Sequence, residues 1–234
     1  MKDNWTDEAF ASAWDGRHVA GNPTRPFLLS VIVAILQDMA AQRASLSVLE
    51  IGSGSGLVTE RILDDVATAT VDGVDYSEPM MAQAAPRLAR HGARFRQHRA
   101  DLAAFDAGTL VPGRFDVVLA LQVLHEIPPA AKRNVLMALR GSLADNGLLL
   151  YGERLRADYA GFAMPHASLW RALSNWTPET KQPDFATRVR EVTGKTDDTT
   201  TLANELTVFG ECGFRVEPLL VLGERCLLAA TPLT

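Results

Sequence analysis

The chain has 234 residues, of which 47% are hydrophobic and 22% are charged, and its formal net charge at neutral pH is −5. This length fits one globular α/β domain with a modest addition, and the acidic balance argues against a surface built mainly for nucleic acid. Two cysteines are too few for a disulfide framework or a metal site, and the polar N-terminus and short apolar runs show neither a signal peptide nor a membrane span, so we predict a cytoplasmic protein without a metal.

The N-terminal part is expected to be helical. Residues 7–14 favour a short helix, and glycines at 16 and 21 together with Asn22 and Pro23 are expected to break the chain. Residues 25–41 then place apolar side chains at helical spacing, which predicts an amphipathic helix beginning near Pro26.

The most informative stretch is VLEIGSGSGLVTERIL, residues 48–63. A short apolar strand carries Glu50 and runs into alternating glycines, and a helix opens at Gly56. Glycines here allow a positive φ and a close approach of the backbone to a ligand, and the free N–H groups of the helix N-terminus suit an anion. The same pattern also fits a tight turn that binds nothing.

A second strand, residues 70–74, ends in Asp75, where an acidic side chain would hold a ribose diol. The alternating glycine spacing differs from the GxGxxG pattern of dinucleotide enzymes. Ser77 is suited to cap the next helix, in which Pro86 predicts a kink or an early end.

Residues 93–98 predict a third strand, followed by Asp101, whose simplest role is to cap a short turn. A basic run lies here and is either a solvated surface or a phosphate contact. It consists of Arg87, Arg90, Arg94, Arg96 and Arg99.

The second half of the chain continues the alternation of strands and helices. We expect a buried parallel strand at 117–121, a helix at 130–143, a turn at 145–147 and a fifth strand at 148–152. Two amphipathic helices follow within 155–201, then a helix capped by Thr199 and ending at Glu211. Strands at 214–220 and 225–230 should form an antiparallel hairpin.

The motif ExGxGxG followed by VDGVDYSEPMM resembles the first two motifs of class I S-adenosylmethionine-dependent methyltransferases, and FDVVLALQVLHEIPP resembles the fourth motif of small-molecule members. The resemblance covers about Trp14 to the C-terminus. It implies an α/β fold, a Rossmann-like doubly wound seven-stranded mostly parallel sheet with an antiparallel C-terminal hairpin, N-terminal helices and a helical insertion between strands 5 and 6. Within one methyltransferase domain, residues 1–43 would form cap helices, 44–154 the cofactor core, 155–200 a substrate-covering insertion, and 201–234 the last helix and hairpin.

The resemblance also implies site residues. S-adenosyl-L-methionine would contact Glu50, Gly52, Ser53, Gly54, Gly56, Asp75, Tyr76, Met80, Asp101, Leu102, Ala120 and Leu121. Many relatives have a polar residue where Leu121 stands, so one expected polar contact is missing. Substrate contacts are assigned to Trp14, Arg25, Glu126, Tyr151, His166 and Trp170, with Arg17 and His18 as further candidates to close the cleft.

His125 is the candidate general base, because it lies just beyond the fourth strand, where ligands bind in open α/β sheets, and because imidazole titrates near neutral pH. The alternative is a histidine that only packs beside the cofactor. A neutral amine acceptor needs no base, whereas a hydroxyl or a carbon acid does.

We therefore predict methyl transfer to an oxygen, nitrogen or carbon atom of a small molecule, an apolar or aromatic metabolite judged by the aromatic insertion (Phe162, Trp170 and Trp176). Nucleic acid and membrane partners are not expected, and the chain should be a monomer or a homodimer. The alternatives are a tRNA-modifying enzyme, supported by the arginine run, and an inactive cofactor-binding subunit, supported by Leu121. A nicotinamide-dependent dehydrogenase is disfavoured by the glycine spacing and the terminal hairpin.

Overall fold

The computed structural model describes residues 4–21, 24–104, 109–176, 183–193 and 199–233. Its α-helices are α1 (Glu8–Gly21), α2 (Arg25–Ala40), α3 (Leu57–Asp65), α4 (Glu78–Leu88), α5 (Pro129–Ser142), α6 (Ala163–Trp176), α7 (Phe185–Thr193) and α8 (Leu202–Glu211). Its strands are β1 (Leu46–Ile51), β2 (Ala69–Asp75), β3 (Phe95–Arg99), β4 (Phe115–Leu121), β5 (Leu143–Arg154), β6 (Phe214–Leu222) and β7 (Arg225–Pro232). Two short 3-10 helices are η1 (Ala89–Arg94) and η2 (Leu124–Glu126).

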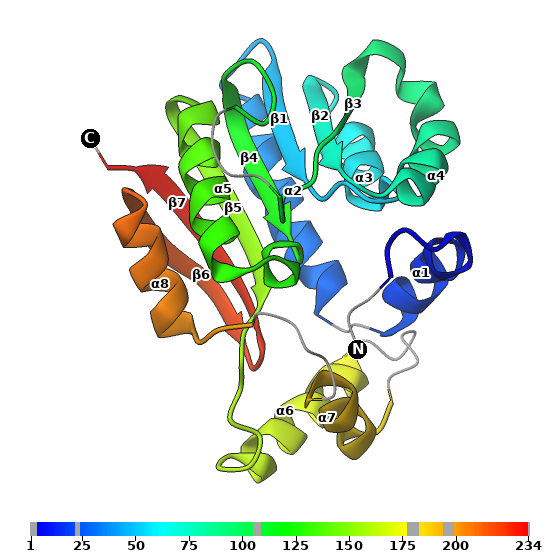
Figure 1. The fold of residues 1–234 in the computed structure, drawn as a ribbon, viewed down its shortest axis with the longest axis vertical. Helices are drawn as coiled ribbons and strands as arrows, with labels where there is room; N and C mark the ends of the chain where they lie inside the picture. The colour runs from blue at the N-terminus through cyan, green and yellow to red at the C-terminus, as the bar shows by residue number, and fades with distance from the viewer. Residues whose placement is uncertain (1–3, 22–23, 105–108, 177–182, 194–198, 234) are drawn as a thin grey trace.

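The strands form one seven-stranded sheet in the order β3-β2-β1-β4-β5-β7-β6 (Figure 1). The first five strands are parallel, and β7 pairs antiparallel with both β5 and β6. The strand order reverses between β1 and β4, so the sheet is doubly wound with its topological switch point there. The predicted fold class, including the terminal hairpin, is confirmed.

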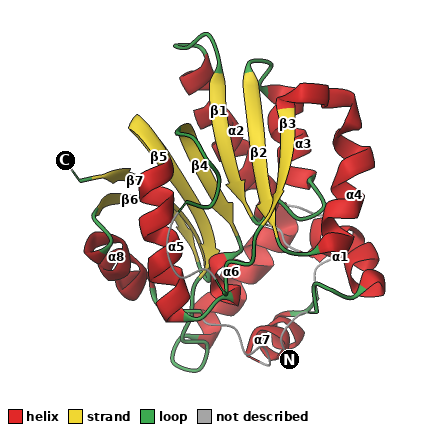
Figure 2. Ribbon diagram, turned by 45° about the horizontal axis from the view of Figure 1, so that its top comes forward, coloured by secondary structure: helices red, strands yellow, loops and turns green. Residues whose placement is uncertain are grey.

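Helices cover both faces of the sheet. Figures 1 and 2 show α5 and α8 on one face and α2, α3 and α4 on the other. On the first face, Val135 and Leu139 of α5 and Phe209 of α8 pack on the sheet; on the second, Ile32 of α2 and Ile62 of α3 do so. These apolar stripes recur at helical spacing, which is why the sequence pattern located the helices.

Several predicted boundaries differ in the structure. Helix α1 continues through Gly16 to Gly21 instead of breaking there, and α8 is capped by Thr201 rather than Thr199, since the Thr201 hydroxyl accepts from the Asn204 N–H. The predicted turn at 145–147 is a bulge inside β5: Phe115 pairs with Leu143 and Val117 with Leu148.

Pro86 does not end its helix, which runs to Leu88 before η1 continues the chain. Helix α4 begins at the Ser77 N-cap, as predicted, because the Ser77 hydroxyl accepts from the Met80 N–H at 3.3 Å.

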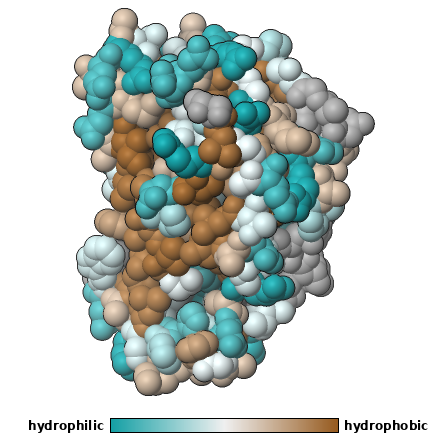
Figure 3. Space-filling view, turned by 90° about the vertical axis from the view of Figure 1, so that its left-hand side faces the viewer, coloured by the Kyte–Doolittle hydropathy of each residue, from teal (hydrophilic) through white to brown (hydrophobic). Residues whose placement is uncertain are grey.

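The carboxyl ends of the parallel strands point toward α1 and the α6–α7 pair (Figure 1). In open α/β sheets ligands bind at this edge, next to the switch point. A broad apolar surface lies elsewhere, on the side where β6 forms the sheet edge (Figure 3), and exposed apolar side chains there include Leu219 and Val221. None of the helices in the described ranges is long and apolar enough to cross a membrane.

Candidate functional site

A cavity of about 330 Å³ lies at the carboxyl ends of β1, β2 and β4. Its wall gathers most of the residues that the sequence assigned to the cofactor. These are Glu50, Gly52, Ser53, Gly54, Asp75, Tyr76, Met80, Asp101, Leu102 and Leu121. Two of that set lie outside the wall: Gly56 caps α3 with a φ of 80°, and Ala120 is buried within β4.

In the glycine turn after β1, backbone atoms rather than side chains form this part of the cavity wall. Gly52 has a φ of 68°, and its N–H donates to the Val74 carbonyl at 2.7 Å, which continues the β1–β2 pairing past the strand end. A Cβ at this position would stand 1.9 Å from a methyl carbon of Val123. Only glycine meets both conditions, so the turn can carry no side chain here.

Asp75 ties the end of β2 to this turn. One carboxylate oxygen accepts from the Gly54 N–H at 2.8 Å and the other from the Ser77 N–H at 2.9 Å. Burial raises the pKa of Asp75, and these backbone donors oppose part of that rise. The carboxylate is therefore fixed in direction at the cavity wall.

Glu50 is buried in β1, with 2% of its surface exposed, and accepts a hydrogen bond from the Thr59 hydroxyl. Burial raises the pKa of Glu50 to about 8, although Thr59 and the charge of Arg25 counteract the rise. Near neutral pH, a positive charge placed beside this carboxyl group would favour its ionised form.

The adenine-side candidates also converge. Asp101 lines the cavity next to Leu102 and accepts from the Ala103 N–H at 2.9 Å, so it caps a turn and faces the cavity at once. Met80 is buried in the wall, whereas Tyr76 is 37% exposed at its rim.

The wall also carries the acceptor candidates Trp14, Arg25 and Glu126. The wall residues that sequence reasoning did not assign include Trp5 and Gln122. The sequence did contain a signal that could have identified Gln122, because it is a polar residue directly after the carboxyl end of an apolar strand. The Arg25 guanidinium donates to the Gln122 side-chain oxygen at 3.2 Å. The side chains of residues 17 and 18, Arg17 and His18, lie outside the part of the chain that the structure describes.

His125 is not in the cavity wall, contrary to its predicted role. Its ring is buried between two carboxylates: Nδ1 lies 2.6 Å from Glu153, and Nε2 lies 3.3 Å from Glu126. Burial alone would lower the pKa of His125, but the charge of Glu153 and hydrogen bonds to both glutamates raise it above the ordinary value. A histidine whose ring lies outside the cavity wall, with both nitrogens beside carboxylates, is a poor general base, and Glu126 is the member of this group that reaches the wall.

Three predicted substrate residues also lie elsewhere. Tyr151 is fully buried in the core, where its hydroxyl donates to Glu205 at 3.1 Å. His166 and Trp170 line a separate cavity of about 30 Å³ between α6, α7 and the β6–β7 turn. Trp170 donates from its indole N–H to the Pro183 carbonyl at 2.9 Å, so it organises the insertion.

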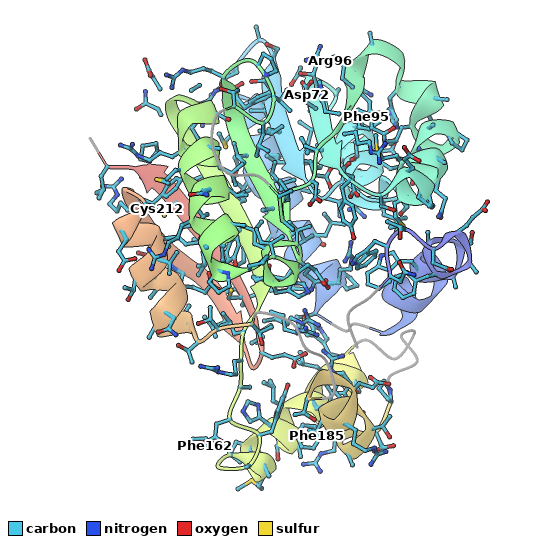
Figure 4. The ribbon with its side chains drawn as sticks, in the orientation of Figure 1. Asp72, Phe95, Arg96, Phe162, Phe185 and Cys212 are labelled. Carbon is cyan, nitrogen blue, oxygen red and sulfur yellow. The ribbon has the colours of Figure 1, made fainter. Side chains whose placement is uncertain are left out.

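The arginine run is engaged by acceptors of the protein itself. Arg96 binds Asp72 through two hydrogen bonds of 2.9 and 2.6 Å, joining β3 to β2 (Figure 4), and Arg99 pairs with Glu78. Arg87, Arg90 and Arg94 likewise contact carboxylates or backbone carbonyls of the α3 and β2 region. These pairings weaken the case for a phosphate-binding surface.

Comparisons with known proteins agree with this geometry. Residues 49–149 match the sequence family described as a methyltransferase domain. The trans-aconitate 2-methyltransferase of Streptomyces avermitilis is 32% identical over 150 residues, which are 61% of this chain and 51% of that protein. A highly reducing polyketide synthase of Phaeosphaeria nodorum is 32% identical over 127 residues, 52% of this chain and 4% of that protein. The chain spans about half or less of the length of the curated relatives it matches.

Solved structures share the fold. The DhpI–SAH complex superimposes with a TM-score of 0.60 at 19% identity, over 97% of this chain and 93% of that one. An O-methyltransferase family protein from Burkholderia thailandensis gives 0.59 at 17% identity, over 99% and 64%. Residues 49–149 of this chain therefore match a methyltransferase domain, and the fold is the one that these methyltransferase structures share.

The residues of the methyltransferase domain fit its cofactor, S-adenosylmethionine. The turn at Gly52 and Gly54 presents backbone without side chains, the Asp75 carboxylate suits a ribose diol, and buried Glu50 suits a positive group. Met80 and Leu102 provide apolar surface for an adenine ring beside Asp101. The donor set and the shape of the turn therefore match an adenosyl amino acid.

We expect cofactor binding to depend on pH through the pKa of Glu50. An ammonium group of S-adenosylhomocysteine beside Glu50 would favour the ionised carboxylate, whereas in the free protein the Glu50 carboxyl group is protonated below about pH 8. Affinity should therefore rise with pH between about 6 and 8, by at most about tenfold per pH unit. Isothermal titration calorimetry across this range measures it. An affinity of the wild type that does not change with pH would contradict the assignment of Glu50. Two controls should show a much weaker dependence of affinity on pH: uncharged methylthioadenosine as the ligand, and the Glu50→Gln variant.

Proposed function

We propose that this chain transfers a methyl group from S-adenosylmethionine to a nucleophilic atom of an apolar or aromatic small molecule. The observation that carries the proposal is the single cavity that joins the two sets of residues. Its wall carries Asp75 and the glycine turn together with Arg25, Gln122 and Glu126. Cofactor and acceptor residues in one cavity are what a direct transfer between two bound molecules requires.

When bound, S-adenosylmethionine supplies a methyl group on a sulfonium that an aligned nucleophile displaces. The residues of the chain hold and orient the reactants. Asp75 would hold the ribose hydroxyls, Glu50 would lie beside the ammonium group, and the bare backbone at Gly52 would leave room for the ligand. Holding two reactants close together and aligned in this way lowers the activation free energy by up to about 7–11 kcal/mol in favourable cases.

Glu126 is the residue that we assign to accept the proton of a hydroxyl acceptor. It lines the cavity, and His125 lies 3.3 Å behind it, itself held by Glu153. The order Glu153–His125–Glu126 fixes the direction in which the Glu126 carboxylate points. The chemistry predicted for His125 is thereby reassigned to its neighbour, with His125 as a positioning residue.

Aromatic side chains favour a flat or apolar acceptor. Trp5 and Trp14 both line the cavity and pack edge to face with ring centroids 4.4 Å apart. The aromatic residues of the insertion, which suggested such an acceptor from the sequence, do not form this wall. Phe162 and Trp176 are 60% and 59% exposed, so the acceptor preference rests on the α1 side of the cavity.

The direct test is turnover. The purified chain is incubated with S-adenosylmethionine and a panel of hydroxyl, amine and carbon-acid acceptors, and S-adenosylhomocysteine is measured. We expect acceptor-dependent release. Tight binding of S-adenosylhomocysteine without consumption on any acceptor would instead favour a cofactor-binding subunit, and a salt-sensitive gel shift with tRNA would favour an RNA substrate.

Glu126→Gln tests the proton acceptor. With a hydroxyl acceptor it should lower kcat by about 100-fold, because a positioned base contributes about 10²–10⁴-fold. The Kd for S-adenosylhomocysteine should change little, and Glu78→Gln, an exposed glutamate on α4, should leave kcat unchanged. Unaltered kcat in Glu126→Gln would remove Glu126 from the mechanism.

A further inference from the structure

Gln122 has an unusual backbone conformation for a residue with a side chain. It follows β4 directly and has a φ of 59°, in the left-handed region that side-chain-bearing residues rarely occupy. The backbone N–H of Gln122 nonetheless donates to the Gly152 carbonyl at 2.6 Å, so the conformation is built into the end of the sheet. Strained backbone of this kind concentrates at functional sites, and here it turns a polar side chain into the cavity wall.

The orientation of the Gln122 amide is fixed by its neighbour. Arg25 can only donate hydrogen bonds, so the amide oxygen must face the guanidinium, as the 3.2 Å contact shows. The amide nitrogen then points away from Arg25. This nitrogen is buried and has no hydrogen-bond partner among the described residues. A buried donor without an acceptor is rare in folded proteins and calls for an explanation.

A bound ligand with an oxygen acceptor explains both features. The Gln122 nitrogen offers two N–H donors beside the cationic Arg25, a combination that suits a carboxylate or another anionic oxygen. The side chains that suit the adenosine part, Asp75 and Asp101, follow β2 and β3. Gln122 instead belongs to the segment after β4 that also carries Glu126, the residue assigned to the proton of the acceptor.

We propose that Gln122, together with Arg25, forms a subsite for an anionic oxygen of the methyl acceptor, so that the preferred acceptors are carboxylates. This inference rests on the proposed function and deepens it by naming the acceptor class. The Gln122 amide nitrogen donates to the acceptor carboxylate. Arg25 supplies a positive charge and fixes the orientation of the amide through its hydrogen bond to the amide oxygen. A specificity-determining residue of this type acts on acceptor binding rather than on the transfer step.

The first experiment separates the acceptor from the cofactor's own carboxylate. Calorimetry compares S-adenosylhomocysteine with methylthioadenosine, which lacks the amino-acid part, in wild type and Gln122→Leu. We expect both affinities to stay within about twofold in the variant, which also shows that it folds. A loss of at least tenfold for S-adenosylhomocysteine alone would overturn the proposal, because it assigns the amide to the cofactor.

The second experiment measures carboxylate recognition directly. Salicylate, trans-aconitate and benzoate are titrated into the S-adenosylhomocysteine-loaded protein by ligand-observed NMR, each beside its neutral primary amide. In the wild type at least one acid should bind at least tenfold more tightly than its amide. Gln122→Leu and the isosteric Gln122→Glu should remove that preference. Equal binding of acids and amides, or no binding of any acid, would overturn the inference.

The two proposals fail separately. Carboxylates that bind through Gln122 but are never methylated would refute the proposed function and leave the subsite in place. Turnover of a carboxylate acceptor with an unchanged KM in Gln122→Leu would refute the subsite and leave the methyltransferase activity in place. Where an acid is methylated, Gln122→Leu should raise KM by at least tenfold with kcat within about threefold.

Discussion

Asp75→Ala should weaken S-adenosylhomocysteine binding by about 100-fold or more, because each hydrogen bond to a charged group contributes about 1.5–3 kcal/mol and a ribose diol makes two. The carboxylate has an additional role in the free protein, since it accepts from the Gly54 and Ser77 N–H groups and so holds the glycine turn against β2. Removal therefore takes away the ligand's partner and loosens the turn that approaches it. Isothermal titration calorimetry gives the Kd.

Two controls keep this result interpretable. Glu78→Ala removes an exposed carboxylate close by in the sequence, which pairs with Arg99 outside the cofactor cavity, and should leave the Kd unchanged. Circular dichroism must show that Asp75→Ala is folded at the titration temperature. A folded variant with wild-type affinity would mean that the ribose is not held at the end of β2. It would contradict the assignment of the cavity wall at Asp75 to the cofactor.

The cofactor side of the cavity was predictable because it depends on local sequence. A glycine at position 52 is required by a positive φ and by the nearness of Val123, and Asp75 is placed by simple strand geometry. Both requirements act over a few residues, so a motif records them. The apolar periodicities that build the sheet and its helices are equally local, and they located almost every element.

The acceptor side was not predictable to the same degree, since it depends on contacts between distant positions. Nothing near His125 in the sequence reveals that Glu153, on β5, holds its ring away from the cavity. Tyr151 alternates with its strand neighbours, but only the packing of α8 shows that it faces Glu205 in the core. The insertion helices were predicted, yet the placement of Trp170 beside a separate small cavity follows from tertiary packing alone.

The buried pair of His125 and Glu153 makes a second large effect predictable, this time on stability. Glu153 is 1% exposed, and its carboxylate accepts from the His125 ring and from the Arg154 N–H at 2.7 Å. Burial would raise the pKa of Glu153, but the charge and hydrogen bond of His125 lower it to about 2. Glu153→Gln removes the nearer of the two carboxylates beside the His125 ring and leaves Glu126 at 3.3 Å, and breaking a buried pair in this way costs about 3–5 kcal/mol of unfolding free energy. Urea denaturation at neutral pH measures the loss.

The pH dependence of stability distinguishes this pair from ordinary packing. The folded pKa of His125 lies above its unfolded value of 6.5, so its contribution is fully present below that value and is lost as pH rises through the folded pKa. The folded pKa of Glu153 lies below its unfolded value of 4.5, so its contribution is present above 4.5 and is lost as pH falls toward about 2. The double variant His125→Gln/Glu153→Gln should be more stable than Glu153→Gln alone, because the buried imidazole that lost its nearer carboxylate is also gone, and it should lose the alkaline decline of the wild type. If the single and double variants were equally destabilised, the pair would be a packing contact rather than a buried ion pair, and His125 would have no charge with which to orient Glu126.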